Sequence, residues 1–190
     1  MPPGPDEEVL FSVDVEASGA SPTVASLLSI GACLVHEPDE AFYVELRPIA
    51  GLTWSEAAER VHGLSRTHLD AAGAEPADAM RSFADWVDRV ARGRRPIFTA
   101  FNAVFDWMFV ADYLHRFIGT NPFGISGLDL KAYYMARHGV AAWAQTGRDA
   151  VRRRYPTELQ HTHHALDDAR EQAELARRLL DRRSHEDGRG

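Results

Sequence analysis

The chain has 190 residues, of which 45% are apolar and 26% charged, a balance typical of one soluble globular domain with its own core. Its net charge of −7 argues against a protein that coats nucleic acid non-specifically, because such binding requires an excess of Lys and Arg. The same charge is compatible with an enzyme that holds one strand end, since metal ions bound by carboxylates supply local positive charge.

The chain predicts a single domain in the cytoplasm. No apolar run is long enough to cross a bilayer, and the acidic, proline-rich start lacks the regions of a signal peptide. Cys33 is the single cysteine, so no internal disulfide can form, and we expect its thiol in the core. We predict one domain over residues 9–183, with polar, flexible ends at 1–8 and 184–190.

The first third of the chain predicts three strands. Apolar runs at Val9–Val15 and Leu27–Val35 indicate buried strands, with Gly and Ser residues between them for a turn. A third strand is expected at Ala41–Leu46. A short helix over Ser55–Val61 then ends at His62–Gly63.

The remaining two thirds predict helices interleaved with one strand. Pro76 opens a helix through Val90, in which apolar residues recur at helical spacing. Pro96–Phe101 is the fourth predicted strand. Further helices are expected over Ala103–Ile118, Gly127–His138 and Ala165–Arg183. This order indicates an α/β fold in which helices cover both faces of a mixed sheet.

An Asp-Val-Glu triplet closes the first predicted strand. Because alternate side chains of a strand point the same way, Asp14 and Glu16 share one face while Val15 faces the other. Two carboxylates on one face repel each other unless a cation lies between them. By itself the triplet more often marks a solvated strand end, because short motifs arise by chance.

Asn102 and Asp106 lie where the fourth strand gives way to a helix. Asn102 is placed to cap that helix, and Asp106 falls in its first turn, with Phe105 and Phe109 anchoring the helix to the sheet. An acidic residue at this position also complements the helix dipole. The segment alone therefore leaves a structural and a metal-binding role open.

A histidine-rich segment, His161-Thr162-His163-His164, precedes Asp167 and Asp168 at the start of the last helix. His163 lies five residues before Asp168, and a histidine beside a metal site suits a general base, since imidazole ordinarily titrates near neutrality. Three alternatives stay open. Asp167 and Asp168 could simply complement the helix dipole, the histidines could be solvated, or His161, His163 and His164 could bind zinc. The lack of a cysteine cluster and of paired ligand spacing disfavours zinc.

Taken together and in this order, the three motifs resemble the DEDDh (DnaQ-like) 3′–5′ exonuclease family, which includes the DNA polymerase III proofreading subunit and ribonuclease T. The segment Val61–Ser65 is also similar to a short His-Gly-Leu segment of the family. The resemblance implies an RNase H-like fold with a mixed five-stranded sheet. It further implies hydrolysis from the 3′ end of single-stranded DNA or RNA, releasing nucleoside 5′-monophosphates.

The same resemblance implies roles for individual residues. Two Mg²⁺ or Mn²⁺ ions would be bound by four carboxylates, with His163 as the general base that activates water. The implied metal ligands, which are also catalytic, are Asp14, Glu16, Asp106 and Asp168. Residues implied near the terminal nucleotide are Ala17, Ser18, His62, Leu64 and Asn102.

Two alternatives stay open beside this interpretation. One is a nucleic-acid-binding domain that kept the fold and lost turnover, although all five catalytic positions are filled. The other is an enzyme similar to oligoribonuclease, an RNA-processing group that uses a tyrosine; candidates are Tyr133, Tyr134 and Tyr155. The choice between DNA and RNA does not follow from the sequence, and a homodimer is expected only by analogy.

Overall fold

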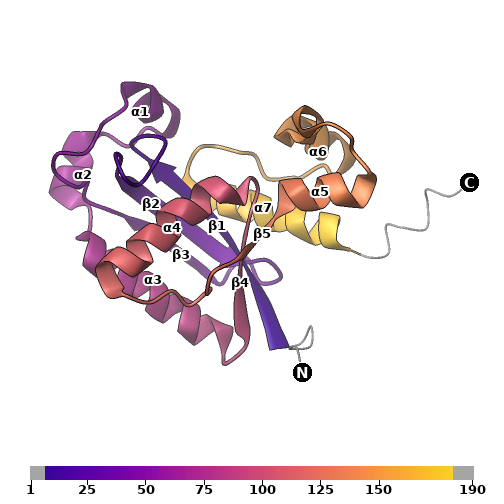
Figure 1. The fold of residues 1–190 in the computed structure, drawn as a ribbon, viewed down its shortest axis with the longest axis horizontal. Helices are drawn as coiled ribbons and strands as arrows, with labels where there is room; N and C mark the ends of the chain where they lie inside the picture. Colours follow the sequence, from indigo (N-terminus) through magenta and orange to yellow (C-terminus); the bar gives the residue numbers. More distant parts are fainter. Residues whose placement is uncertain (1–6, 182–190) are drawn as a thin grey trace, which may run out of the picture.

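A five-stranded mixed sheet forms the centre of the molecule in a computed structural model that describes residues 7–181 (Figure 1). The strand order is β3-β2-β1-β4-β5, with β1 antiparallel to β2 and parallel to β4. The strands are β1 (Glu8–Ala17), β2 (Leu27–Leu34), β3 (Ala41–Glu45), β4 (Arg95–Ala100) and β5 (Gly127–Asp129). The mixed five-stranded sheet expected from the sequence is confirmed.

Helices connect and cover these strands. They are α1 (Glu56–His62), α2 (Arg66–Ala72), α3 (Pro76–Ala91), α4 (Ala103–Ile118), α5 (Leu130–His138), α6 (Arg148–Arg154) and α7 (Ala165–Leu180), with a 3-10 turn, η2 (Trp143–Thr146). Figure 1 shows α3 and α4 across one face of the sheet and α7 across the other. No described helix has both the length and the apolar character needed to span a bilayer.

The side chains of β1 divide between the two faces of the sheet. Phe11, Val13 and Val15 are buried in the main core with residues of α3 and α4. Ser12 points the other way, because its Oγ donates to the carbonyl oxygen of Ala169 in α7 at 2.7 Å. The alternation predicted for this strand is therefore confirmed, and it places the even-numbered side chains toward α7.

The cysteine prediction is also confirmed, since the Cys33 thiol is buried in β2. Burial raises its pKa to about 12, because the surrounding apolar groups disfavour a thiolate.

The helix predicted over Gly127–His138 is wrong in its first residues. Gly127–Asp129 pairs with β4 in parallel and forms the edge strand β5. The helix then begins at Leu130, since Oδ1 of Asp129 accepts a hydrogen bond from the N–H of Ala132 at 2.8 Å and caps it. The short elements α2, α6 and η2 were not predicted.

The chain ends differ slightly from the prediction. Glu8, expected in the flexible start, belongs to β1, while residues 1–6 lie outside the described residues. The last helix ends at Leu180, and residues 182–190, which include the predicted flexible end, also lie outside them.

Candidate active site

Three of the four predicted metal-binding carboxylates converge between the sheet and α7. Asp14 and Glu16 come from β1 and Asp168 from the first turn of α7, and one oxygen of each lies within 4.8 Å of the others. Asp14 and Asp168 are buried, and Glu16 is partly buried. Carboxylates this close repel one another in the absence of a cation, and their oxygens are the ligands that Mg²⁺ and Mn²⁺ prefer.

Gly31 lets α7 approach the sheet closely enough to form this cluster. It pairs with Asp14 across β1 and β2. A methyl group on Gly31 would lie 2.1 Å from the backbone carbonyl carbon of Ala165, so only a residue without a side chain fits. The glycine therefore sets the first turn of α7, and with it Asp168, beside Asp14.

The fourth carboxylate, Asp106, reaches the site from α4 and is tied to the backbone of β1. The pairing of β1 with β4 ends at Ser12 and Thr99. Beyond that point the N–H of Val15 donates to Oδ1 of Asp106 at 3.1 Å. Asp106 is buried and lies outside the group of three mutually close carboxylates, yet its charge contributes to the raised pKa of Asp14.

Asn102 does not cap α4 through its side chain, contrary to the prediction. It stands at the N-cap position with φ 67°, in the left-handed region, and its side chain makes no capping hydrogen bond. Instead its backbone carbonyl accepts from the N–H of Phe105 at 3.1 Å. Asn tolerates this conformation better than most residues, and the resulting tight turn takes the chain from β4 into α4.

Burial disfavours the charged form of three carboxylates, and neighbouring cluster charges add to this effect for Asp14 and Glu16. Burial, followed by the charges of Asp106, Glu16 and Asp168, holds the pKa of Asp14 well above its usual value. Burial and the charges of Asp168 and Asp106 raise the pKa of Glu16 to about 8, and burial raises that of Asp106 to about 7. A cation placed among these groups would restore their charged forms.

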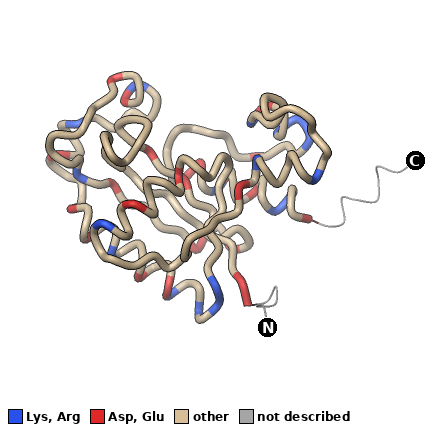
Figure 2. The backbone as a smooth tube through the Cα atoms, in the orientation of Figure 1, with Lys and Arg blue, Asp and Glu red and all other residues tan. Residues whose placement is uncertain are grey.

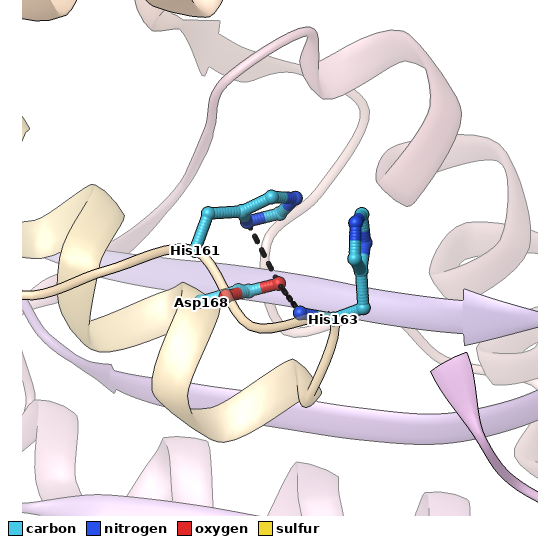
Figure 3. Close-up of side chains that lie close together, drawn as sticks. All are labelled: His161, His163 and Asp168. Carbon is cyan, nitrogen blue, oxygen red and sulfur yellow. Dashed lines mark hydrogen bonds and ion pairs between the residues drawn. The ribbon is translucent and has the colours of Figure 1, made fainter. Parts of the chain in front are cut away.

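Asp168 behaves in the opposite way because the preceding loop satisfies it. Its Oδ1 accepts from the N–H of Thr162 at 2.7 Å. Its Oδ2 accepts from the N–H of His163 at 2.9 Å, a hydrogen bond drawn in Figure 3. Burial acts to raise the pKa of Asp168, but these hydrogen bonds and the nearby His161 imidazole outweigh it, so the pKa is lowered. The carboxylate thus holds the histidine loop in place.

His163 stands in this loop in a strained backbone conformation. Its φ of 61° lies in the left-handed region, which a residue with a Cβ rarely adopts. The hydrogen bond from its N–H to Asp168 helps to hold it there. Figure 3 shows the rings of His161 and His163 standing on the same side of the loop, and their centroids lie 4.4 Å apart. Such strain often accompanies functional sites.

Gln172 belongs to the site although the motifs do not include it. It is fully buried on α7, and its Nε2 donates to Oδ1 of Asp14 at 3.0 Å while its Oε1 accepts from the N–H of Phe101. It thereby links α7 to β1 and to the end of β4. Its position four residues after Asp168, on the same helix face, was the available signal.

Arg148 is a second unpredicted neighbour of the carboxylates. It starts α6, whose basic residues are visible in Figure 2, and its guanidinium lies 5.0 Å from the ring centroid of Phe101. Its Nη1 contacts Oε2 of the fully buried Glu171 at 2.5 Å. Its positive charge counteracts the raised pKa of Asp14. No sequence signal singled it out, because α6 itself was not predicted.

His62 leaves one of its imidazole nitrogens without a hydrogen-bond partner among the described residues. Its Nδ1 accepts from the N–H of Leu64 at 3.0 Å, so the nitrogen without a partner in the described structure is Nε2. Burial lowers the pKa of His62, the charge of Glu59 opposes this shift, and the charge of His163 adds to it.

Two other residues predicted near the substrate, Ala17 and Ser18, are buried in the protein. Ala17 is buried, and the Ser18 hydroxyl donates to the carbonyl of Thr53 while accepting from the N–H of Ser26. The contacts with a terminal nucleotide predicted for Ala17, Ser18, His62, Leu64 and Asn102 stay predictions.

The candidate tyrosines lie in the second, smaller core. Tyr134 and Tyr155 are buried there among residues of α5, α6 and α7, and the Tyr155 hydroxyl lies 2.9 Å from Nε2 of His138. Tyr133 lies on α5, partly buried against the same core. The backbone N–H of His163, by contrast, donates a hydrogen bond to Asp168, a member of the carboxylate cluster.

Comparison with known proteins finds relatives over nearly the whole chain. The RNase_T model, described as Exonuclease, matches residues 11–176. The 3′-5′ DNA exonuclease Cap18 of Escherichia coli is 42% identical over 181 residues, which cover 94% of this chain and 95% of that protein.

Two solved structures share the fold. The nuclease domain of 3′hExo, a DEDDh family member bound to rAMP, has a TM-score of 0.75 at 19% identity and covers 90% of this chain and 91% of that chain. E. coli Exonuclease I in complex with a dA16 oligonucleotide has a TM-score of 0.71 at 15% identity, covering 93% of this chain and 42% of that one. The RNase H-like fold implied by the motifs is confirmed.

Proposed function

The chain is a 3′–5′ exonuclease that belongs to the DEDDh group of the exonuclease family, and on this basis we propose that it hydrolyses single-stranded DNA. The proposed reaction follows a two-metal mechanism. The observation that carries the proposal is the convergence of Asp14, Glu16 and Asp168 within 4.8 Å. DNA is favoured because the relative at 42% identity is a DNA exonuclease.

The donor set fits a pair of hard divalent cations. Members of this family use divalent metal ions, and the residues proposed to hold Mg²⁺ or Mn²⁺ here are Asp14, Glu16, Asp106 and Asp168. All four offer carboxylate oxygens, and burial raises the pKa values of Asp14, Glu16 and Asp106. When bound, two such ions would stabilise the charge that develops on the attacking and leaving oxygens of the phosphodiester.

The protein's own groups would complete the reaction. An imidazole nitrogen of His163 takes a proton from the attacking water, whose oxygen forms a bond to phosphorus. The bond from phosphorus to the leaving 3′ oxygen breaks, and that oxygen leaves with the electron pair and takes a proton from a second water, while His163 later returns its proton to the solvent. The products are a nucleoside 5′-monophosphate and a strand shortened by one residue. Gln172 keeps Asp14 oriented through its 3.0 Å hydrogen bond.

Degradation of 5′-labelled oligonucleotides tests the proposal. Single-stranded DNA and RNA of several lengths, with open or blocked 3′ ends, would be incubated with Mg²⁺ and then with EDTA. We expect stepwise loss of mononucleotides from open DNA ends, and no loss from blocked ends or in EDTA. Preferred degradation of short RNA would favour the oligoribonuclease-like alternative, and binding without turnover would favour the inactive domain.

Asp14→Ala supplies the matched control, because it removes a proposed ligand and leaves the strand intact. We expect no hydrolysis and an unchanged circular dichroism spectrum, whereas wild-type turnover in this variant would remove the assignment. The cytoplasmic setting and the homodimer stay predictions, and size-exclusion chromatography with light scattering tests the latter.

A further inference from the structure

His161, His163 and Asp168 form a second cluster of potential metal ligands beside the carboxylates. One nitrogen of each imidazole and one oxygen of Asp168 lie within 4.8 Å of one another. Figure 3 shows both rings on the same side of the loop, with the Asp168 carboxylate between their backbone positions. The proposed hydrolysis assigns a role to His163 and Asp168 but none to His161.

The donor atoms of this cluster differ in kind from those of the carboxylate site. Two imidazole nitrogens and one carboxylate oxygen suit Zn²⁺, whereas Mg²⁺ prefers oxygen alone. Three protein ligands with a water in the fourth position are a common zinc arrangement. We propose that His161, His163 and Asp168 form a zinc-binding site that shares Asp168 with the proposed magnesium site.

The geometry needs little adjustment for a tetrahedral ion. Nδ1 of His161 lies 2.8 Å from Oδ2 of Asp168 without completing a regular hydrogen bond within the described residues. Ligand atoms around tetrahedral zinc lie about 3.3 Å apart, as follows from bond lengths near 2.0–2.1 Å. The separations here, from 2.8 Å to at most 4.8 Å, bracket that value, so rotations of the side chains suffice.

The loop that carries the two histidines is held at both ends. Glu174 of α7 accepts hydrogen bonds from the N–H groups of Glu158 at 3.0 Å and Leu159 at 3.2 Å. Asp168 accepts from those of Thr162 and His163. The ligands are therefore presented by a fixed loop, which lowers the entropic cost of binding an ion.

Occupancy by zinc would inhibit the nuclease. The ion would engage His163, the proposed proton acceptor, and Asp168, a proposed magnesium ligand, at the same time. This consequence rests on the proposed function, whereas zinc binding itself does not. Zinc would therefore act as a reversible inhibitor, and removal of the ion would restore activity.

Calorimetric titration of the full chain with Zn²⁺, supported by the visible spectrum of bound Co²⁺, tests the site without reference to activity. We expect His161→Asn to weaken zinc binding by at least about tenfold, since loss of an outer-shell partner alone costs about that much. His164→Asn is the matched control, because the ring of His164 stacks on Tyr43 instead, at 4.6 Å. It should leave zinc affinity unchanged.

Glu16→Gln separates this site from the carboxylate cluster. If zinc binds where we propose, Glu16→Gln weakens it less than His161→Asn does. A larger loss in Glu16→Gln, or wild-type affinity in His161→Asn, would overturn the proposal. His161→Gln repeats the test if His161→Asn does not fold, as judged by circular dichroism.

Nuclease assays in Mg²⁺ with rising Zn²⁺ concentration then test the proposed inhibition. Each variant is normalised to its own rate without zinc, and inhibition should require at least about tenfold more zinc in His161→Asn than in the wild type. Equal inhibition of the wild type and of His161→Asn would contradict inhibition through this zinc site. If the chain degrades no substrate at all, the proposed function fails while the calorimetry still decides on the zinc site.

Discussion

The carboxylate cluster has a strand half, Asp14 and Glu16, and a loop half, Asp168, and the pKa values of the two halves are shifted in opposite directions. Asp14 and Glu16 on β1 have raised pKa values because burial and neighbouring carboxylates disfavour their charge. Asp168 has a lowered pKa because hydrogen bonds from its own loop outweigh burial. Without a bound cation the charged form is therefore disfavoured in the strand half, whereas hydrogen bonds favour it in the loop half. An ion that binds the cluster must displace protons from the strand half, and it must accept Asp168 as a ligand while that carboxylate keeps its hydrogen bonds to the loop.

The largest expected effect comes from Asp14→Asn in the strand half. We expect kcat to fall by at least about a thousandfold, since a metal ligand contributes several kcal/mol to transition-state stabilisation. The metal-free protein should unfold at the same or a higher temperature, because the substitution removes a repelling buried carboxylate. Single-turnover kinetics and thermal unfolding in EDTA measure both. A marked loss of stability would contradict the difference between the halves.

Asp168→Asn should act differently in the loop half. Asn has one acceptor oxygen, so one of the two backbone N–H groups of residues 162 and 163 loses its acceptor, at a cost of about 1–3 kcal/mol. Activity should fall by about a hundredfold or more through the loss of a metal ligand.

Asp167→Asn is the control for this substitution, since the Asp167 side chain is exposed. It should change neither stability nor rate. Chemical denaturation and steady-state kinetics compare the two variants, and a larger effect at Asp167 would show that the motif is offset by one residue.

Gly31→Ala should damage the contact that joins the halves. The added methyl group meets the backbone of Ala165, and overpacking of this kind costs about 1–3 kcal/mol. Because α7 must move away from β2, activity should fall even under conditions in which the protein stays folded. Gly147→Ala is the matched control, since a methyl group there meets nothing within 4 Å. Similar behaviour of the two variants in urea unfolding would contradict this role of Gly31.

The smallest expected effect is a pH dependence of stability in the strand half. Folding raises the pKa of Glu16 from 4.5 to about 8. The folded state therefore binds more protons than the unfolded chain between these values, and the free energy of unfolding without metal should fall as pH rises through that range. Stabilisation by Mg²⁺ should grow over the same range, because the ion binds the charged carboxylates.

Thermal unfolding between about pH 5 and pH 8, in EDTA and in Mg²⁺, measures this dependence. Glu16→Gln should flatten the profile obtained in EDTA. A metal-free profile that rises with pH would mean that other groups dominate the linkage.

Local pattern was sufficient where the structure depends on local geometry. Alternation along β1 predicted that Asp14 and Glu16 share a face, and the pair does lie toward Asp168. The helix over Ala103–Ile118 was predicted at its observed bounds, because Gly119 ends it in the left-handed conformation.

Features that depend on distant partners were not predictable in this way. The three residues of β5 form a strand only because β4 lies beside them. Arg148 joins the site through its contact with the ring of Phe101, at the end of β4. The left-handed turn at Asn102 likewise follows from the path between β4 and α4 and not from its capping preference.

The hydrogen bond from Gln172 to Asp14 joins residues 158 positions apart along the chain. The first and last elements of the domain must therefore meet before the site exists, and such long-range closure slows folding relative to helical proteins of similar size. A chain still emerging from the ribosome lacks α7 and with it Asp168. Under this order of assembly, cleavage activity appears only after synthesis of the domain is complete.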